Sequence, residues 1–486
     1  MTKIKQFIKK YEAMPVVARA SLWFVICGFM TRGVSLLTTP IFTRLLTTEQ
    51  YGVYSVFNSW LEIVTIFASL KLGYGVYIQG LVKFNDDQDR FSSSLLGLAT
   101  TWCGGVFLIY LLFHKTFNSL LGLETPMMVC MFVMVISTVA LDFWSARKRN
   151  EFKYATLVKV TMFIVVMKPV LGVIAVLLTN DAYKVEARIA TLALVELAVG
   201  VILYIQIMSR GHEFYNKKYW KYALLFNLPL VPHFLSQVIL NHSDRIMIQK
   251  MVGASAAGVY SLAYSMAMIL SMINTSILQA IRPWVFQRIK AGEKEKIQPV
   301  VVSAILVVAF CNIMLISFAP ELVAIFAPGS YSGAIRLMPP ITLAVLFAFL
   351  YNLFVDIEMY FEKTKSVMSI AIVCAAINLI TNYFGIMWFG YAAAAYTTLA
   401  CYILMAILHY CSMERMLLKN NIEGKIYDAK IIVAISLAHV LIGTVMGVLS
   451  GHLFLRLIVM AILAVVLYLN RSRFTQIFVL IKNKRH

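Results

Sequence analysis

The sequence predicts an all-α polytopic membrane protein with 14 transmembrane helices, arranged as two pseudo-symmetric six-helix lobes plus two extra C-terminal helices. Three observations support this fold class. The 486-residue chain is 60% hydrophobic and only 14% charged. Its apolar residues form continuous blocks long enough to cross a bilayer as helices, whereas the strands of a membrane barrel would alternate. A short sequence also recurs at corresponding places in two long apolar halves.

The apolar blocks give the transmembrane spans in chain order. We expect spans at 16–38, 53–78, 92–113, 126–144, 155–178, 188–208, 222–243, 254–279, 298–319, 337–357, 366–386, 389–411, 430–450 and 453–470. The longest connections, at 281–297, 320–336 and 412–429, are too short for a soluble catalytic or nucleotide-binding domain. The chain has no P-loop sequence, so ATP is not expected to drive it directly.

The basic residues define the orientation. With the N-terminus in the cytoplasm, 30 of the 43 Lys and Arg residues fall in cytoplasmic segments and 8 in outer segments. This bias predicts an even number of spans with both termini cytoplasmic. The net charge of +20 therefore reflects membrane topology and does not indicate nucleic-acid binding. The seven cysteines form no Cys-x-x-Cys pair, so we expect no disulfide framework, metal site or cofactor.

An internal repeat defines the two lobes. The sequence Gly-Val-Tyr-Ser begins at Gly52 and again at Gly258, and each copy is followed by a matching serine, Ser59 or Ser265. Six spans separate the copies, an even number, so the halves should be parallel and related by an axis along the membrane normal. We expect an N-terminal lobe at 1–210, a C-terminal lobe at 211–411, and helices 13 and 14 with a basic cytoplasmic tail at 412–486.

Charged residues at membrane depth are costly and usually face a cavity or a partner. Glu62 and Lys71 fall on roughly opposite faces of the second span, so they cannot pair with each other within that helix. Lys168 and Glu196 fall at the same depth in adjacent antiparallel spans, which predicts a buried ion pair with a structural or coupling role. Arg32 lies in the outer half of the first span without an in-helix partner.

Other charged residues have a simpler interpretation. Asp142, Asp356 and Glu358 end their spans near the cytoplasm, so we expect them at the membrane interface. Every cation predicted in mid-membrane belongs to the first lobe. A cavity lined in this way would be positive and would attract an anion such as a phosphate, which arginine binds through its planar fork of donors.

Three stretches of the chain resemble a known transporter family. They are Thr39–Leu46 followed by Glu49–Tyr54, then Ser243–Ile248 leading to Ala257–Tyr260, and the outer loop from Pro320 to Ala334. This pattern is similar to that of bacterial polysaccharide flippases of the Wzx type. Its motifs are typical of the larger superfamily that includes the multidrug MATE exporters, and less specific to the polysaccharide branch.

The resemblance implies a function and site residues. Such flippases move an oligosaccharide linked by pyrophosphate to undecaprenol from the cytoplasmic to the outer leaflet of the bacterial inner membrane, for O-antigen or capsule synthesis. Basic residues in their central cavity engage the lipid phosphates. We match Arg32 and Arg44 to that role, with Lys71, Lys168 and Arg245 as further substrate-binding candidates. Glu62, Glu196 and Asp244 complete the site as structural or coupling partners.

The expected partners are membrane lipids, a polysaccharide polymerase and a chain-length regulator, and no catalytic activity is expected.

Two rival functions remain open. A cation-coupled multidrug exporter of the same fold should have an acidic cavity, against the basic bias seen here. A membrane glycan polymerase or glycosyltransferase should have a sizeable outer loop or an acidic catalytic pair, and this sequence has neither.

Overall fold

The computed structural model describes residue 14 and residues 16–420 and 426–469, and these residues are helical with no strand. The chain divides into two compact units, Met1–Val238 (unit 1) and Ile239–His486 (unit 2), with the division inside helix α11. The predicted fold class, an all-α polytopic membrane protein, is confirmed. Each unit is described separately below.

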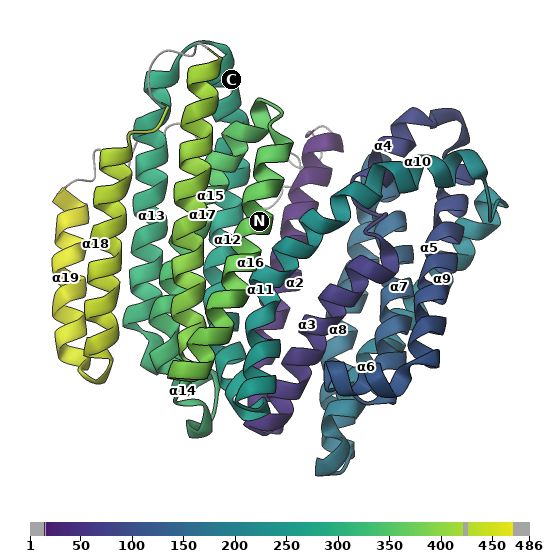
Figure 1. Ribbon diagram of the computed structural model, residues 1–486, viewed down its shortest axis with the longest axis horizontal. Helices are drawn as coiled ribbons and strands as arrows, with labels where there is room; N and C mark the ends of the chain where they lie inside the picture. Colours follow the sequence, from purple (N-terminus) through teal and green to yellow (C-terminus); the bar gives the residue numbers. More distant parts are fainter. Residues whose placement is uncertain (1–13, 15, 421–425, 470–486) are drawn as a thin grey trace, which may run out of the picture. The chain divides into compact units, whose positions relative to one another are not determined.

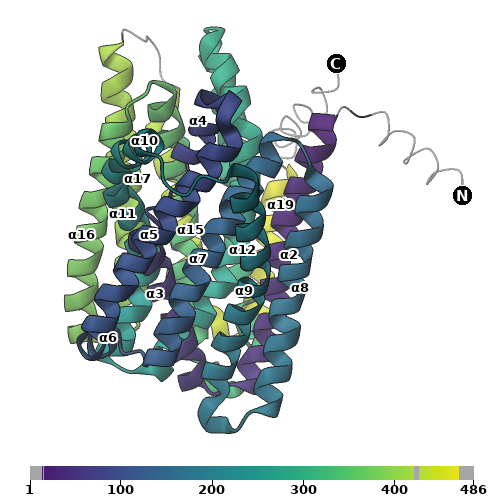
Figure 2. The ribbon, with the colours of Figure 1, turned by 90° about the vertical axis from the view of Figure 1, so that its right-hand side faces the viewer.

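Unit 1 is built around the pair α7 and α9, which make its most extensive helix contact (Figure 2). Helix α8 packs on α9, α2 packs on α8, and α5 packs on both α9 and α7. The helices of this unit are α2 (Val16–Leu45), α3 (Thr48–Ser69), α4 (Val76–Lys83), α5 (Gln88–Leu112), α6 (His114–Leu121), α7 (Thr125–Asn150), α8 (Tyr154–Leu178), α9 (Lys184–Gly211), α10 (Lys217–Asn227) and the first part of α11 (Val231–Met251).

Unit 2 is built around α15, which packs on α17, α12, α13 and α18 (Figure 1). Helix α16 packs mainly on α17, and α18 packs on α13. The helices of this unit are the rest of α11, α12 (Ala254–Lys290), α13 (Ile297–Ser317), α14 (Ala319–Phe326), α15 (Ala334–Tyr360), α16 (Thr364–Phe389), α17 (Ala393–Lys419), α18 (Ala429–Val448) and α19 (Leu453–Leu469).

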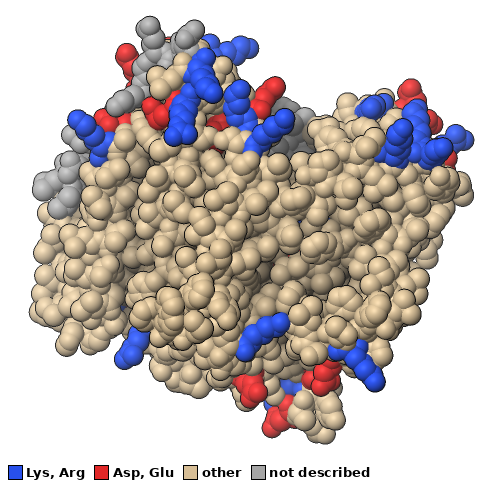
Figure 3. Space-filling view, in the orientation of Figure 1, with Lys and Arg blue, Asp and Glu red and all other residues tan. Residues whose placement is uncertain are grey.

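Eleven helical segments of the described residues are long and apolar enough to cross a membrane. Three further helices, α2, α3 and α19, overlap the remaining predicted spans, and the total of fourteen stays a prediction. On the face shown in Figure 3, Lys, Arg, Asp and Glu gather at the ends of the helices and leave a broad uncharged surface between them. That distribution is typical of helices whose middle sections face lipid.

The predicted second span is interrupted. Helix α3 ends at Ser69, and α4 begins only at Val76. Leu70 and Lys71 have left-handed backbone conformations, with φ of 50° and 48°, which cost non-glycine residues about 1 kcal/mol or more each. The side-chain amide of Asn227 on α10 donates a hydrogen bond to the Leu70 carbonyl and helps to hold this turn. The placement of Lys71 on a continuous helix was therefore wrong.

The two copies of the repeat occupy equivalent local positions. Gly52 is the fifth residue of α3, and Gly258 is the fifth residue of α12. In both copies the final serine donates to the carbonyl four residues earlier, at 3.0 Å for Ser59 and 2.7 Å for Ser265. The local geometry supports the repeat, while the superposition of two complete lobes stays a prediction.

One helix of unit 1 has contrasting glycines. A Cβ atom on Gly97 of α5 would lie 2.0 Å from the carbonyl oxygen of Phe214, a backbone atom that cannot turn aside. A Cβ atom on Gly104 or Gly105, farther along α5, would meet nothing within 4 Å. Gly97 is therefore required by close approach of the 212–216 loop.

Candidate functional site

The predicted ion pair at membrane depth is present. Lys168 of α8 donates from Nζ to Oε1 of Glu196 on α9. The Lys168 side chain is 28% exposed and that of Glu196 only 11%. The hydroxyl of Thr138 on α7 donates to the second carboxylate oxygen of Glu196 at 3.4 Å. The charge of Lys168 is thus partly neutralised, and an incoming anion would have to compete with Glu196 for it.

Lys71 lies close to a second acidic group. The turn that carries it packs against Asp142 of α7, whose Cβ atom is 2.9 Å from the position that a Cβ on Gly73 would take. Lys71, Glu62 and Glu196 are among the charged groups that act on the Asp142 carboxyl through Coulomb interaction. Within the described residues, neither Lys71 nor Glu62 forms an ion pair within 4.0 Å. Lys71, Asp142, Glu62, Lys168 and Glu196 form what we call the unit 1 ionic cluster.

The two arginines matched to phosphate binding lie on α2. Arg32 belongs to this helix, but its side chain lies outside the described residues. Arg44 lies in the last turn of α2, not beyond its end, because the helix continues to Leu45. Its exposed guanidinium donates to the Pro40 carbonyl at 2.9 Å.

Asp244 of α11 is the acidic residue of the second family-like stretch, which we call the second motif (Ser243–Ile248 with Ala257–Tyr260). It is 1% exposed and accepts hydrogen bonds from Tyr260 at 2.6 Å, Asn382 at 2.5 Å and Thr398 at 2.9 Å. These donors come from α12, α16 and α17, so one carboxylate joins four helices of unit 2. No ion pair of Asp244 within 4.0 Å occurs among the described residues.

Arg245 is enclosed by protein. Its guanidinium lies over the ring of Tyr264, 4.2 Å from the ring centroid, and donates to the Asn241 carbonyl at 3.0 Å. Arg44 makes the same bond to the carbonyl four residues before it, so the motif arginines share one local geometry. Arg245 is only 8% exposed, which limits how directly it can meet a large substrate.

Two acidic residues expected at the membrane interface, Asp356 and Glu358, are buried by the protein in unit 2. Asp356 of α15 pairs with Arg282 of α12 at 2.7 Å. Glu358, two residues farther along α15, is fully buried and contacts His409 of α17. Both carboxyl groups are covered by protein because α15 packs against α12, α13, α17 and α18, and their position at the membrane interface stays a prediction.

Sequence reasoning missed one buried cation of unit 1. Arg188 of α9 is only 8% exposed, and no role in the site is predicted for it from the sequence. Its guanidinium lies between the rings of Phe42 on α2 and Tyr54 on α3, at 3.6 and 3.4 Å from their centroids. Such stacking stabilises helix contacts through cation–π attraction. No spacing in the sequence indicates it, because the three residues belong to three distant segments.

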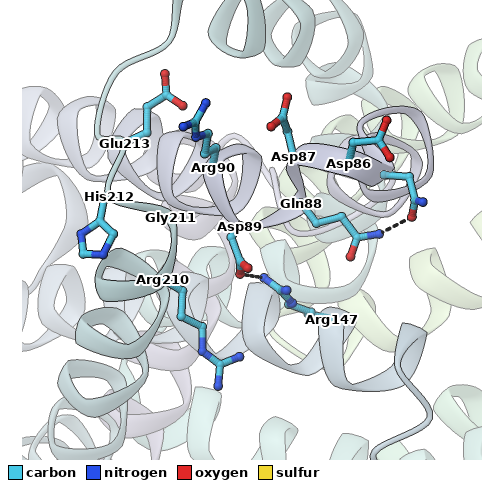
Figure 4. A pocket seen from close by; sticks show the side chains of 11 residues that line it. Asp86, Asp87, Gln88, Asp89, Arg90, Arg147, Arg210, Gly211, His212 and Glu213 are labelled. Atoms are coloured by element: carbon cyan, nitrogen blue, oxygen red, sulfur yellow. Dashed lines mark hydrogen bonds and ion pairs between the residues drawn. The ribbon is translucent and has the colours of Figure 1, made fainter.

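A polar cavity of about 780 Å³ opens beside the α4–α5 junction and the end of α9 (Figure 4). Arg147 of α7 forms an ion pair with Asp89 at its floor. Its lining carries charges of both signs and includes none of the predicted site residues. The lining residues are Asn85, Asp86, Asp87, Gln88, Asp89, Arg90, Arg147, Arg210, Gly211, His212 and Glu213. We interpret it as a solvated charged surface.

The loop after α7 is fixed by a local ionic network. Burial disfavours the ionised Glu151 carboxyl, but hydrogen bonds from Arg147, Lys148 and Lys153 outweigh that effect and lower the pKa of Glu151 to about 2. The Arg147 bond measures 2.9 Å, and those from Lys148 and Lys153 both measure 3.1 Å. The basic residues predicted to orient the chain here also fasten α7 to its loop.

No metal centre of the common side-chain type is apparent. Within the described residues, no group of three or more His, Cys, Asp or Glu side chains is arranged to hold a metal ion. Five of the eight predicted site residues, namely Glu62, Lys71, Lys168, Glu196 and Asp244, belong to the unit 1 ionic cluster or to the Asp244 network of unit 2. Both groups lie at helix–helix contacts.

Comparison of the sequence with protein families places it in one of them. The profile of the family described as "Polysaccharide biosynthesis protein" matches residues 17–289, more than half of the chain. The profile described as "MatE" matches residues 229–384. Two Haemophilus influenzae proteins, "Lsg locus putative protein 1" and "Uncharacterized membrane protein", are 23% and 22% identical over 56% and 55% of this chain, and the matches span 67% and 65% of their own lengths.

Solved structures share the fold. An inward-facing MATE family multidrug transporter aligns with a TM-score of 0.62 at 12% identity, over 81% of this chain and 96% of its own. The lipid II flippase MurJ in an inward closed conformation also gives a TM-score of 0.62, at 14% identity over 90% of this chain and 100% of its own. The chain therefore belongs to the family described as "Polysaccharide biosynthesis protein", and it shares its fold with these two solved transporters.

Proposed function

We propose that this protein is a flippase for undecaprenyl-pyrophosphate-linked oligosaccharides, moving them from the cytoplasmic to the outer leaflet for O-antigen or capsule synthesis. The observation that carries the proposal is the turn at Lys71. Two consecutive residues with left-handed backbone, Leu70 and Lys71, lie between α3 and α4, so the Lys71 ammonium group falls within a predicted span. Strained backbone of this kind persists where surrounding structure holds it, and it concentrates at functional sites. A cation held at this depth suits a phosphate.

The proposed mechanism is alternating access without a covalent intermediate. Arg32, Arg44, Lys71, Lys168 and Arg245 are the substrate-binding candidates, and the two phosphates would draw on those that a given state exposes. Because Glu196 already holds Lys168, pyrophosphate binding there requires exchange of one anion for another. Such exchange keeps the ammonium paired in every state and lowers the cost of an empty cavity.

The location and partners follow from the same proposal. We place the protein in the bacterial inner membrane with both termini in the cytoplasm. The predicted lobes, at 1–210 and 211–411, would open the substrate site to each side of the membrane in turn. A polysaccharide polymerase and a chain-length regulator would take up the product at the outer leaflet. Membrane lipids are the remaining partners.

Substitutions of Arg32 test the proposal in cells that depend on this protein for surface polysaccharide. We expect Arg32→Ala to abolish display while the protein's level in the membrane stays normal. Arg32→Lys should retain only part of the polysaccharide display, because an ammonium keeps the charge but loses the bidentate geometry. Full display with Arg32→Ala would reject the assigned role.

The Asp244 network favours a second candidate function, a cation-coupled exporter of drugs. A buried carboxylate without an ion-pair partner in the described residues can bind a proton or a small cation, and the MatE profile matches this region. Export of a cationic dye by wild-type cells, lost in Asp244→Asn, would support this candidate. Surface polysaccharide that depends on the protein, with no dye export, would favour the flippase.

A further inference from the structure

Glu358 and His409 form an enclosed acid–base pair in unit 2. Both side chains are 0% exposed, and Nδ1 of His409 lies 2.6 Å from Oε2 of Glu358. Ser412 donates to the other carboxylate oxygen, and its Oγ lies 2.7 Å from Oγ of Ser366 at the start of α16. The Glu358 carboxylate therefore joins α15 to α17, and Ser412 extends the contact to α16.

One atom of this pair remains unsatisfied. Nε2 of His409 is buried and has no hydrogen-bond partner among the described residues. The ring of Tyr351 stacks on the imidazole, with 5.9 Å between the ring centroids, and gives no charge compensation. Buried polar atoms are nearly always hydrogen-bonded. Within the described residues, His233 and His439 also have buried ring nitrogens without a partner, but of these three histidines only His409 pairs with a carboxylate.

The surrounding charged groups do not balance Glu358. Its only ion-pair partner among the described residues is His409. On the neighbouring elements, Asp356 is held by Arg282 of α12, Glu414 of α17 interacts with Tyr410, and the buried Tyr427 before α18 packs on Phe354. The exposed Lys363 and Lys365, at the start of α16, form no ion pair with this carboxylate.

The proton count of the pair decides its charge. With Glu358 ionised and His409 neutral, the pair carries one negative charge inside the helix bundle. Adding one proton, to the imidazole or to the carboxyl group, makes the pair neutral overall. An uncompensated charge is far more costly in a low-dielectric interior than a neutral pair.

We propose that Glu358 and His409 form a proton-binding site whose occupancy controls how tightly α15, α16 and α17 pack. The proton comes from water and returns to it, and no other bond forms or breaks. This proposal concerns proton binding by the protein and does not depend on which substrate is carried.

The site is connected to the second motif through aromatic side chains. Tyr351 stacks on both His409 and Tyr402, at centroid distances of 5.9 and 6.0 Å. The Tyr402 hydroxyl donates to Oδ1 of Asn241 at 3.0 Å, three residues before Asp244 on α11. A change of charge at the pair would therefore act on packed side chains that reach α11, within unit 2.

The test measures proton binding in the purified, full-length protein in detergent. Infrared difference spectra between about pH 5 and 9, the range in which histidine charge commonly changes, report the protonation of carboxyl and imidazole groups. Thermal unfolding over the same range reports stability. The variants are Glu358→Gln and His409→Gln, with His452→Gln, an exposed residue, as the matched histidine control. Ser412→Ala keeps both titrating groups and removes one hydrogen bond to Glu358.

We expect the wild-type protein to show a coupled carboxyl and imidazole change that is lost in Glu358→Gln and His409→Gln and kept in His452→Gln. The unfolding temperature should fall with rising pH by about 1–2 °C per pH unit as pH approaches the midpoint from below, where the folded protein keeps a proton that the unfolded chain has lost, and should level off above the midpoint. Glu358→Gln should remove that fall. Ser412→Ala should shift the midpoint without abolishing the change. The proposal would be overturned if the wild-type protein showed no spectral change. It would also be overturned if Glu358→Gln and His409→Gln gave the spectra and stability profiles of wild type.

Discussion

Removing one charge of the Lys168–Glu196 pair should destabilise the protein more than removing both. Lys168→Met leaves Glu196, whose side chain is 11% exposed, with the Thr138 hydroxyl at 3.4 Å as its remaining partner. Breaking a fully buried pair costs about 3–5 kcal/mol. Because Lys168 itself is 28% exposed, solvent screening reduces the expected loss to about 2–3 kcal/mol.

The other single variant and the double variant complete the cycle. Glu196→Gln leaves an ammonium that water partly reaches, so we expect a loss of about 1–2 kcal/mol. Combining Lys168→Met with Glu196→Gln removes both charges and should lie within about 1 kcal/mol of wild type. The resulting coupling energy is about 2 kcal/mol or more, as expected for directly contacting charges.

Thermal unfolding of the detergent-purified proteins measures this cycle, with Lys159→Met as the control. Lys159 is on the same helix and exposed, so its substitution should change the unfolding temperature little. If Lys168→Met has the unfolding temperature of wild type, the pair does not stabilise the fold. The same holds if the loss of stability in the double variant equals the sum of the losses in the two single variants.

Three further predictions concern other contacts. Gly97→Ala should cost about 2–3 kcal/mol by overpacking against a backbone carbonyl, whereas Gly104→Ala on the same helix should be neutral or stabilising; unfolding temperatures decide this. The hydrogen bonds from Arg456 lower the pKa of Glu321 below its ordinary 4.5, so their stabilisation should be present above pH 4.5 and be lost as pH falls through the lowered pKa. Arg456→Met should remove that acid-linked loss, and an unchanged stability profile would contradict it. Arg188→Lys should cost about 1 kcal/mol because an ammonium cannot stack between two rings, and equal unfolding temperatures would refute this.

Much of the charged architecture of unit 1 was predictable because depth in a membrane helix can be counted along the chain. Lys168 and Glu196 lie at equal depth in adjacent helices, and the ion pair followed from that alone. Lys71 was misplaced because helical periodicity does not reveal a turn held by a distant residue, here Asn227 of α10.

The contacts of unit 2 were less predictable for a related reason. Glu358 and His409 are 51 residues apart and meet only because α15 and α17 pack closely. Polarity near a span end indicates an interface when lipid surrounds the helix, but α15 is surrounded by protein. Which helix occupies the centre of a lobe is a property of packing, and no single-span pattern encodes it.

The most direct test of the flippase proposal is transport by the purified protein in proteoliposomes. The two probes are a fluorescent undecaprenyl-pyrophosphate oligosaccharide, followed by its accessibility at the outer leaflet, and a cationic dye. Lys71→Asn removes the charge and suits the left-handed backbone, and Lys71→Arg keeps the charge. We predict that wild type moves the lipid-linked glycan and not the dye, that Lys71→Asn slows glycan movement about tenfold or more, as expected for one lost charge-assisted contact, and that Lys71→Arg retains most of it. Dye transport without glycan movement, or full glycan movement by Lys71→Asn, would contradict the account.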